Sequence, residues 1–131
     1  EVWFRLLRYI GHWQARGYGY WSIRESDSGA YVGSVGVLDY RREMTPGFDA
    51  PELGWGVAPA FQGQGLAFEA LQAALAWTDA YRLEPRTVCM ISPENAPSVR
   101  LAERVGYRPY AETDYKGSHV TLFERPRAVA G

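Results

Sequence analysis

Hydrophobic residues recur along this chain of 131 residues with two different spacings. Over residues 1–16 and 66–81 they return every three or four positions, which predicts two amphipathic helices. Over 52–57 they alternate instead with Glu and Gly, as they do in a strand that buries one face. The short apolar run 87–91 predicts another strand, central in the sheet and parallel to the strand at 52–57.

The remaining segments predict two hairpins and a third helix around this strand–helix–strand unit. Asn95 is suited to cap that helix, and Gly106 is suited to end it. The prediction is strands at 17–24 and 31–40, a loop at 44–51, a helix at 97–105, and strands at 107–115 and 119–125 joined at Lys116-Gly117. This order predicts an α+β fold whose mixed, mostly antiparallel sheet is flanked by helices.

Composition limits the classes of function. Residues 1–131 are expected to form one domain, and because the first residue is Glu rather than Met we expect an N-terminal part of the natural protein to be missing. The hydrophobic content of 47% and net charge of −1 are ordinary for a globular protein and favour neither nucleic acid nor a membrane surface as partner. One cysteine, Cys89, forms no internal disulfide and fits a cytoplasmic protein.

The turn before the helix at 66–81 carries the clearest chemistry. Gly63 and Gly65 leave the backbone accessible where the helix begins, and the free N–H groups of a helix N-terminus suit a phosphate. The turn lacks the Lys-Ser/Thr pair of a nucleoside-triphosphate loop, because Leu66 and Ala67 follow Gly65. It also lacks the third glycine of a dinucleotide fingerprint, where Phe68 stands. The alternative interpretation is a tight strand–helix connection that binds no ligand.

What remains is Gln62-x-x-Gly65-x-Ala67, which resembles the acetyl-CoA signature of the GNAT N-acetyltransferases. Residues 92–107, with Asn95-x-x-Ser98 and Val105-Gly-Tyr, resemble the second signature of the same family. Residues 11–13 and 17–21 resemble the branch that includes the ribosomal-protein N-terminal acetyltransferases. The resemblance covers the chain in the right order and implies the GNAT fold, whose central strands splay apart and whose first strand is absent from this sequence.

The resemblance also implies a set of binding residues for acetyl-CoA, the donor substrate. Pantetheine would pair with backbone near Val57, whose N–H would hold the thioester carbonyl, and the second helix would approach the pantetheine. The cofactor-binding residues so implied are Val57, Gln62, Gly63, Gln64, Gly65, Leu66, Ala67, Asn95 and Ser98. Capping alone would also explain Asn95, and no metal is expected.

Glu52 is the candidate catalytic residue, because a carboxylate can take the proton from an attacking amine. The alternatives are an exposed carboxylate at a strand end, or Glu94 as the base. Many family members use a tyrosine of the second helix as the acid for the leaving thiolate, but Ala102 stands at that position, and Tyr107 is expected to be packing.

Other reactive side chains have plainer interpretations. Cys89 is expected to be a buried, inert thiol, and His12 and His119 lack the spacing of metal ligands. Arg100, Arg104 and Arg108 suggest a solvated helix edge, although Arg100 could reach a phosphate. Four aromatic residues near the N-terminus suit either the core or the border of an acceptor cleft: Trp13, Tyr18, Tyr20 and Trp21.

The sequence therefore predicts an acetyl-CoA-dependent N-acetyltransferase acting by direct attack of an amine, which could be a protein N-terminus or a small molecule. Two alternatives stay open: a GNAT domain that binds CoA without catalysis, as a sensor or scaffold, and an interaction module without a cofactor. The uncovered sheet edge expected from the absent first strand suggests a homodimer.

Overall fold

The computed structural model describes residues 2–128, so Glu1, the first residue of the predicted N-terminal helix, lies outside it. Six strands form one mixed sheet in the order β1-β2-β3-β4-β6-β5. Every neighbouring pair is antiparallel except β3 and β4, which are parallel. The strands are β1 (Tyr20–Arg24), β2 (Tyr31–Leu38), β3 (Glu52–Val57), β4 (Arg86–Ile91), β5 (Arg108–Tyr115) and β6 (Ser118–Pro126).

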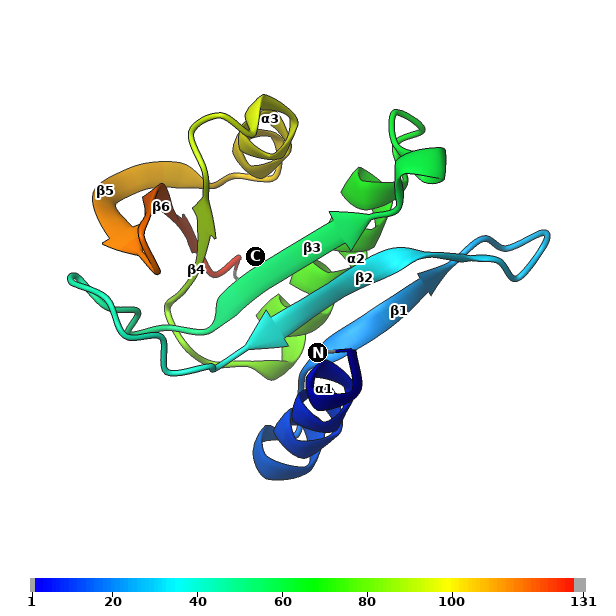
Figure 1. Ribbon diagram of the computed structural model, residues 1–131, viewed down its shortest axis with the longest axis horizontal. Helices are drawn as coiled ribbons and strands as arrows, with labels where there is room; N and C mark the ends of the chain where they lie inside the picture. The colour runs from blue at the N-terminus through cyan, green and yellow to red at the C-terminus, as the bar shows by residue number, and fades with distance from the viewer. Residues whose placement is uncertain (1, 129–131) are drawn as a thin grey trace.

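Helices cover both sides of the sheet. They are α1 (Val2–Arg16), α2 (Leu66–Tyr81) and α3 (Ala96–Arg104), and a short 3-10 turn, η1 (Pro59–Phe61), follows β3. In Figure 1, α2 lies behind β1, β2 and β3, and α1 lies below them. Buried side chains of α2 and α3 belong to one hydrophobic core with residues of β2, β3 and β4. The mixed α+β sheet predicted from the sequence is confirmed.

The central strands β3 and β4 separate along their length, as the resemblance implies. They share one registered pair, Glu52 with Val88, and the N–H of Val88 donates to the carbonyl of Pro51 at 2.9 Å. Beyond that point the two strands diverge, as Figure 1 shows. The sheet therefore consists of two halves that meet where β3 and β4 begin.

Two strand boundaries differ from the prediction because the side chain of His12 forms hydrogen bonds with backbone groups at both places. His12 is buried in α1; its Nδ1 lies 2.7 Å from the carbonyl of Tyr18, and its Nε2 accepts a 2.8 Å hydrogen bond from the N–H of Asp39. The first strand thus begins at Tyr20 rather than residue 17, and the second ends at Leu38 rather than residue 40. The neutral ring must carry its proton on Nδ1, because Nε2 is the acceptor.

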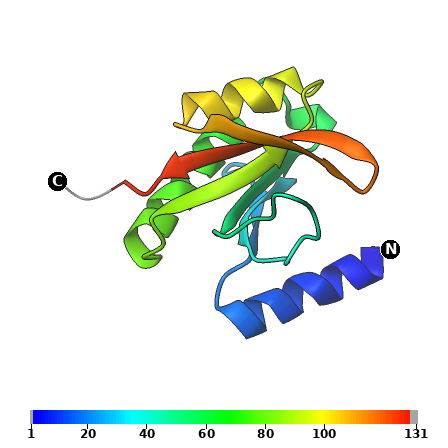
Figure 2. The same ribbon diagram turned by 90° about the vertical axis from the view of Figure 1, so that its left-hand side faces the viewer.

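The loop 39–51 joins β2 to β3 in the chain and makes hydrogen bonds to both α1 and the β5–β6 hairpin. Its Asp39 is held by His12, and the carbonyl of Thr45 accepts a 2.5 Å hydrogen bond from the hydroxyl of Thr113 on β5. Figure 2 shows the loop between α1 and the strands β4 to β6. This long-range closure brings the charged side chains of the loop over the start of β3.

Gly33 permits the close pairing of β2 and β3. A Cβ there would overlap the carbonyl oxygen of Gly56 and lie 2.9 Å from Cα of Val57. We expect Gly33→Ala to lower the free energy of unfolding by about 1–3 kcal/mol, because two backbones would have to move apart. Urea denaturation measures the loss. Gly11→Ala is the control, since a Cβ at this helical position meets nothing within 4 Å and should add about 0.5–1 kcal/mol. Equal stability of Gly33→Ala and the parent would contradict this.

Candidate functional site

One cleft brings together the end of β3, the glycine turn and the start of α3. Its volume is about 820 Å³, within the range of small-molecule sites. It is lined by Trp55, Gly56, Val57, Phe61, Gln62, Gly63, Gly65, Leu66, Ala67, Phe68, Asn95, Pro97, Ser98, Arg100, Leu101 and Arg104. We call this the cofactor cleft. It lies at the wide end of the gap between β3 and β4.

The glycine turn leaves the backbone N–H groups at the N-terminus of α2 uncapped beside this cleft. Gly63 and Gly65 both have φ of +76°, a left-handed conformation that glycine adopts without strain, and a Cβ on either would meet nothing within 4 Å. Gly65 is the N-cap of α2, and no side chain caps the helix. The first N–H groups of α2 therefore have no intrahelical partner and carry the positive end of the helix dipole.

Two side chains of the turn hold its shape from within. The amide of Gln62 donates to the carbonyl of Val57 at 3.2 Å, so that carbonyl is already engaged. The amide of Gln64 lies 3.5 Å from the carbonyl of Ala60, and Gln64 is the predicted binding residue that the cleft lining does not include. Gln62 thus shapes the turn, and it lines the cavity together with the other predicted cofactor residues except Gln64.

The start of α3 forms the opposite wall. Asn95 caps the helix by accepting a 3.3 Å hydrogen bond from the N–H of Ser98, so the predicted cap is present and faces the cleft at the same time. Arg100 and Arg104 also line the cleft, and Arg104 lies 3.7 Å above the ring of Phe68. Arg108 belongs instead to β5, so the predicted helix edge of three arginines is wrong at its last member.

The charge of the cofactor cleft suits an anion. Among the described residues that line it, two are arginines and none is acidic. Arg104 and Phe68 were not predicted as binding residues. Their sequence signal was weak, because an arginine on a helix edge and an aromatic residue in the first turn of a helix are both common in packing roles.

Glu52 lies at the other end of β3, about 16 Å along the strand from Val57 at ~3.3 Å per residue. Only 5% of it is exposed, so the interpretation as an exposed strand-end carboxylate is wrong. Its Oε1 accepts a 2.7 Å hydrogen bond from Nε of Arg42 on the loop 39–51. Burial raises the pKa of the Glu52 carboxyl, and the Arg42 guanidinium opposes part of that rise.

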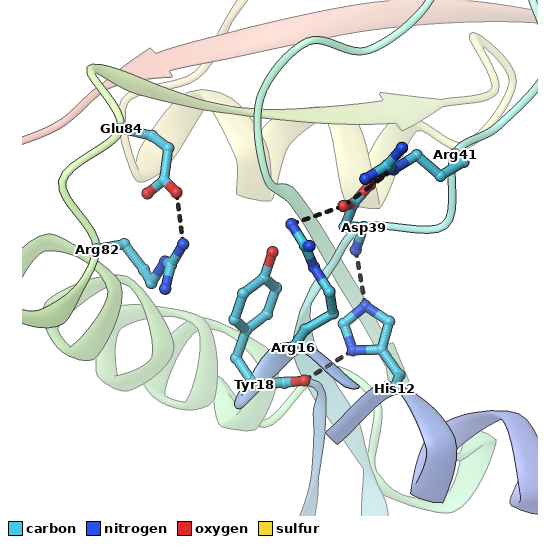
Figure 3. Close-up of polar contacts among 7 residues, drawn as sticks. All are labelled: His12, Arg16, Tyr18, Asp39, Arg41, Arg82 and Glu84. Atoms are coloured by element: carbon cyan, nitrogen blue, oxygen red, sulfur yellow. Dashed lines mark hydrogen bonds and ion pairs between the residues drawn. The ribbon is translucent and has the colours of Figure 1, made fainter. Parts of the chain in front are cut away.

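Glu52 opens into a second cavity of about 340 Å³, which we call the inner cavity. It is lined by Arg16, Tyr18, Leu38, Asp39, Tyr40, Arg41, Arg42, Phe48, Asp49, Ala50, Pro51, Glu52 and Glu84. Figure 3 shows part of its charged lining: Arg16 and Arg41 both reach Asp39, Tyr18 lies beside Arg16, and Arg82 pairs with Glu84. Apart from Glu52 itself and Tyr18, offered as a possible border of an acceptor cleft, the lining of this cavity was not predicted, because a loop far from its partners in the chain closes it.

Other candidate residues are accounted for by packing. Ala102 is fully buried, and Tyr107 is 3% exposed with its hydroxyl 2.7 Å from that of Thr87. Cys89 is buried as predicted, and burial raises the pKa of its thiol. Glu94, the alternative base, is exposed and accepts a hydrogen bond from Ser92.

The four aromatic residues near the N-terminus serve mainly the core and the sheet. Tyr18 is 2% exposed, and Trp21 packs edge-on against Trp77 of α2 with ring centroids 5.3 Å apart. Trp13 donates from its indole to the carbonyl of Tyr20 at 2.8 Å. Of the four, Tyr18 also lines the inner cavity.

The profile of the GNAT acetyltransferase domain matches residues 1–108. The chain belongs to the GNAT acetyltransferase family. A solved structure from Bordetella pertussis that is assigned to this family superposes with a TM-score of 0.87 at 43% identity, over 94% of this chain and 74% of that one. The yncA protein of Salmonella typhimurium, solved with acetyl-CoA, has the same fold, with a TM-score of 0.77 at 23% identity over 100% and 76% of the two chains.

Curated relatives include the alanine N-acetyltransferase of ribosomal protein uS5 from Escherichia coli. It is 32% identical over 73 residues, which make up 56% of this chain and 38% of that enzyme. Across three curated relatives the matched part spans 38% to 63% of their length. The family and the resemblance to this branch are therefore confirmed.

The cofactor cleft fits the acyl-CoA donor that a GNAT domain uses. A diphosphate needs backbone N–H donors and cationic side chains, and the uncapped start of α2 with Arg100 and Arg104 supplies both. Among residues 2–128, no group of three His, Cys, Asp or Glu side chains is placed to hold a metal ion. None of the described helices is both long and apolar enough to cross a membrane.

Proposed function

We propose that this GNAT domain is an acetyl-CoA-dependent N-acetyltransferase that acetylates a primary amine by direct attack, without an acyl-enzyme. One observation carries the proposal: a cleft suited to a diphosphate and a buried carboxylate occupy opposite ends of β3, the strand that borders the splayed centre of the sheet. A donor held at one end and a proton acceptor at the other are the two parts that this reaction needs.

The donor would be held by Val57, by residues 62–67 of the turn and by Asn95 and Ser98. Bound acetyl-CoA would supply an activated thioester, and backbone N–H groups of β3 between Val57 and Glu52 would stabilise charge on its carbonyl oxygen. At a position between these two residues, the amine would lose its proton to Glu52 directly or through water. Arg42 fixes the orientation of the Glu52 carboxylate through their 2.7 Å contact.

The leaving thiol receives no acid from the positions that the family resemblance indicates. Ala102 has no ionisable group, and the Tyr107 hydroxyl is buried against Thr87. This observation favours the second candidate function, a GNAT domain that binds CoA as a sensor or scaffold. A CoA thiolate leaves readily enough that catalysis without an acid remains our first proposal.

Acetyl-CoA is expected to stabilise the folded protein, because a ligand that binds only the native state shifts the equilibrium toward it. At a concentration one hundred times Kd the gain is about 2.7 kcal/mol. Thermal denaturation with and without acetyl-CoA measures the shift, and thiol release with a panel of amines measures transfer. No stabilisation would refute the cofactor role, and stabilisation without thiol release from any amine would leave the sensor function.

A further inference from the structure

The inner cavity adjoins a more basic cavity of about 670 Å³ between α1, the loop 39–51 and the β5–β6 turn. We call this the basic cavity. Both cavities are bordered by Arg16, Asp39, Tyr40, Arg41 and Arg42. The two cavities are therefore neighbours; we call them together the recess, and its inner part reaches the carboxylate of Glu52.

The two parts of the recess carry opposite balances of charge. The inner cavity has four carboxylates, from Asp39, Asp49, Glu52 and Glu84, against three arginines. The basic cavity has five cationic side chains, from Arg8, Arg16, Arg41, Arg42 and Lys116, against one carboxylate, Asp39. The excess of negative charge therefore lies around the buried Glu52, and the excess of positive charge lies around the exposed Arg8 and Lys116.

The positive charge of the basic cavity is only partly neutralised. Arg16 and Arg41 share Asp39, at 2.8 and 3.1 Å, and Arg42 is paired with Glu52. Among residues 2–128, Arg8 and Lys116 contact no carboxylate and lie instead against tyrosine rings, 5.9 Å from the centroid of Tyr40 and 5.4 Å from that of Tyr115. Both side chains are exposed at the rim, so they are available to an anion.

Resting on the proposed function, we propose that the acceptor is a small primary amine that also carries an anionic group, a carboxylate or a phosphate. The amine would lie in the inner cavity, where carboxylates attract its protonated form and Glu52 takes its proton. The anionic group would lie in the basic cavity between Arg8 and Lys116. A polyamine would place a second positive charge among five cationic side chains, which disfavours it.

Matched pairs of amines test this directly. Lysine and cadaverine share a terminal amine on an alkyl chain and differ by a carboxylate, and phosphoethanolamine differs from ethanolamine by a phosphate. We expect kcat/KM to be at least tenfold higher for the anionic member of one pair. The pair that shows the preference identifies the anion as carboxylate or phosphate.

Variants connect the preference to the recess. In Arg8→Gln/Lys116→Gln the ratio of kcat/KM within the preferred pair should fall about tenfold, while kcat/KM for the member without the anionic group stays within about twofold. Arg24→Gln is a control, because this substitution removes a positive charge from the far end of β1, where Arg24 donates to the carbonyl of Gly29. That variant should keep the parent ratio. Differences in amine basicity cancel, since each ratio is compared across proteins.

The outcomes separate the two proposals. Equal or better use of the amines without an anionic group would overturn the acidic-acceptor inference and leave acetyl transfer in place. A preference that survives in Arg8→Gln/Lys116→Gln would also overturn it, because the anion would then bind elsewhere. Transfer to no amine of either kind would refute the proposed function, and the inference with it.

Discussion

Replacing Glu52 with Gln is expected to lower kcat for acetyl transfer about 10²–10⁴-fold near neutral pH, with the affinity for acetyl-CoA unchanged. The amide keeps the volume of the side chain and an oxygen for Arg42, but it accepts no proton from the amine. The cofactor cleft lies at the opposite end of β3, so donor binding should not change. Steady-state kinetics and calorimetric titration of acetyl-CoA measure the two quantities.

The alternative is that Glu52 matters only as the partner of buried Arg42. Asp79→Asn is the matched control, because Asp79 and Arg125 form a comparable pair at 3.0 Å, with 14% and 15% of their side chains exposed. Breaking that pair should lower stability while kcat below the melting temperature stays at the parent value. Full activity of Glu52→Gln would remove Glu52 from the mechanism.

The pH dependence of kcat/KM follows from the burial of the same carboxyl. Burial raises the pKa of Glu52, and the base works only when ionised. Activity should therefore rise with pH through an apparent pKa above that of an ordinary glutamate. A pH–rate profile of the parent measures this limb, and its persistence in Glu52→Gln would assign it to another group.

Gly65→Val is the second large effect that we expect, a loss of acetyl-CoA affinity of roughly 10–100-fold. Gly65 has φ of +76°, and a β-branched residue there costs about 1–2 kcal/mol or forces the turn into another shape. A Cβ at Gly65 would meet no protein atom within 4 Å. The loss of affinity would therefore come from the strained backbone and from the valine side chain filling the entrance of the cleft. Calorimetric titration measures Kd.

A control for strain is available in the β1–β2 turn. Gly29 has φ of +71° and equally open surroundings, and it does not line the cofactor cleft. Gly29→Val should lower stability by a similar amount without changing Kd for acetyl-CoA. Equal losses of affinity in both variants would mean that general destabilisation, rather than the turn, governs binding.

The elements near the cofactor cleft could be predicted from sequence because each is encoded locally. The apolar stripe and the glycine turn set the bounds of α2 at Leu66 and Tyr81, as predicted, and Lys116 and Gly117 adopt the two positive φ angles of the predicted hairpin turn. Asn95 caps α3 through its own side chain, although the helix runs one residue earlier than predicted at each end.

What could not be predicted depends on contacts between distant segments. His12 ends a strand 27 positions away by binding the N–H of Asp39, and no periodicity signals such a bond. Arg42 reaches both Glu52 and the hydroxyl of Tyr115, which lies 73 positions along the chain. The residue types were visible in the sequence, but their meeting depends on how the loop 39–51 closes.

The single registered pair between β3 and β4 has a mechanical consequence. A ladder of hydrogen bonds cannot set the width of the gap beyond Val88, so rigidity there must come from the side chains of α2 and α3 that share the core. A substitution that loosens this core, for example at Leu71, should therefore change the width of the gap and weaken acetyl-CoA binding without a direct contact to the donor. Under the proposed function, tight interior packing is what keeps the gap between β3 and β4 at the width that the donor needs.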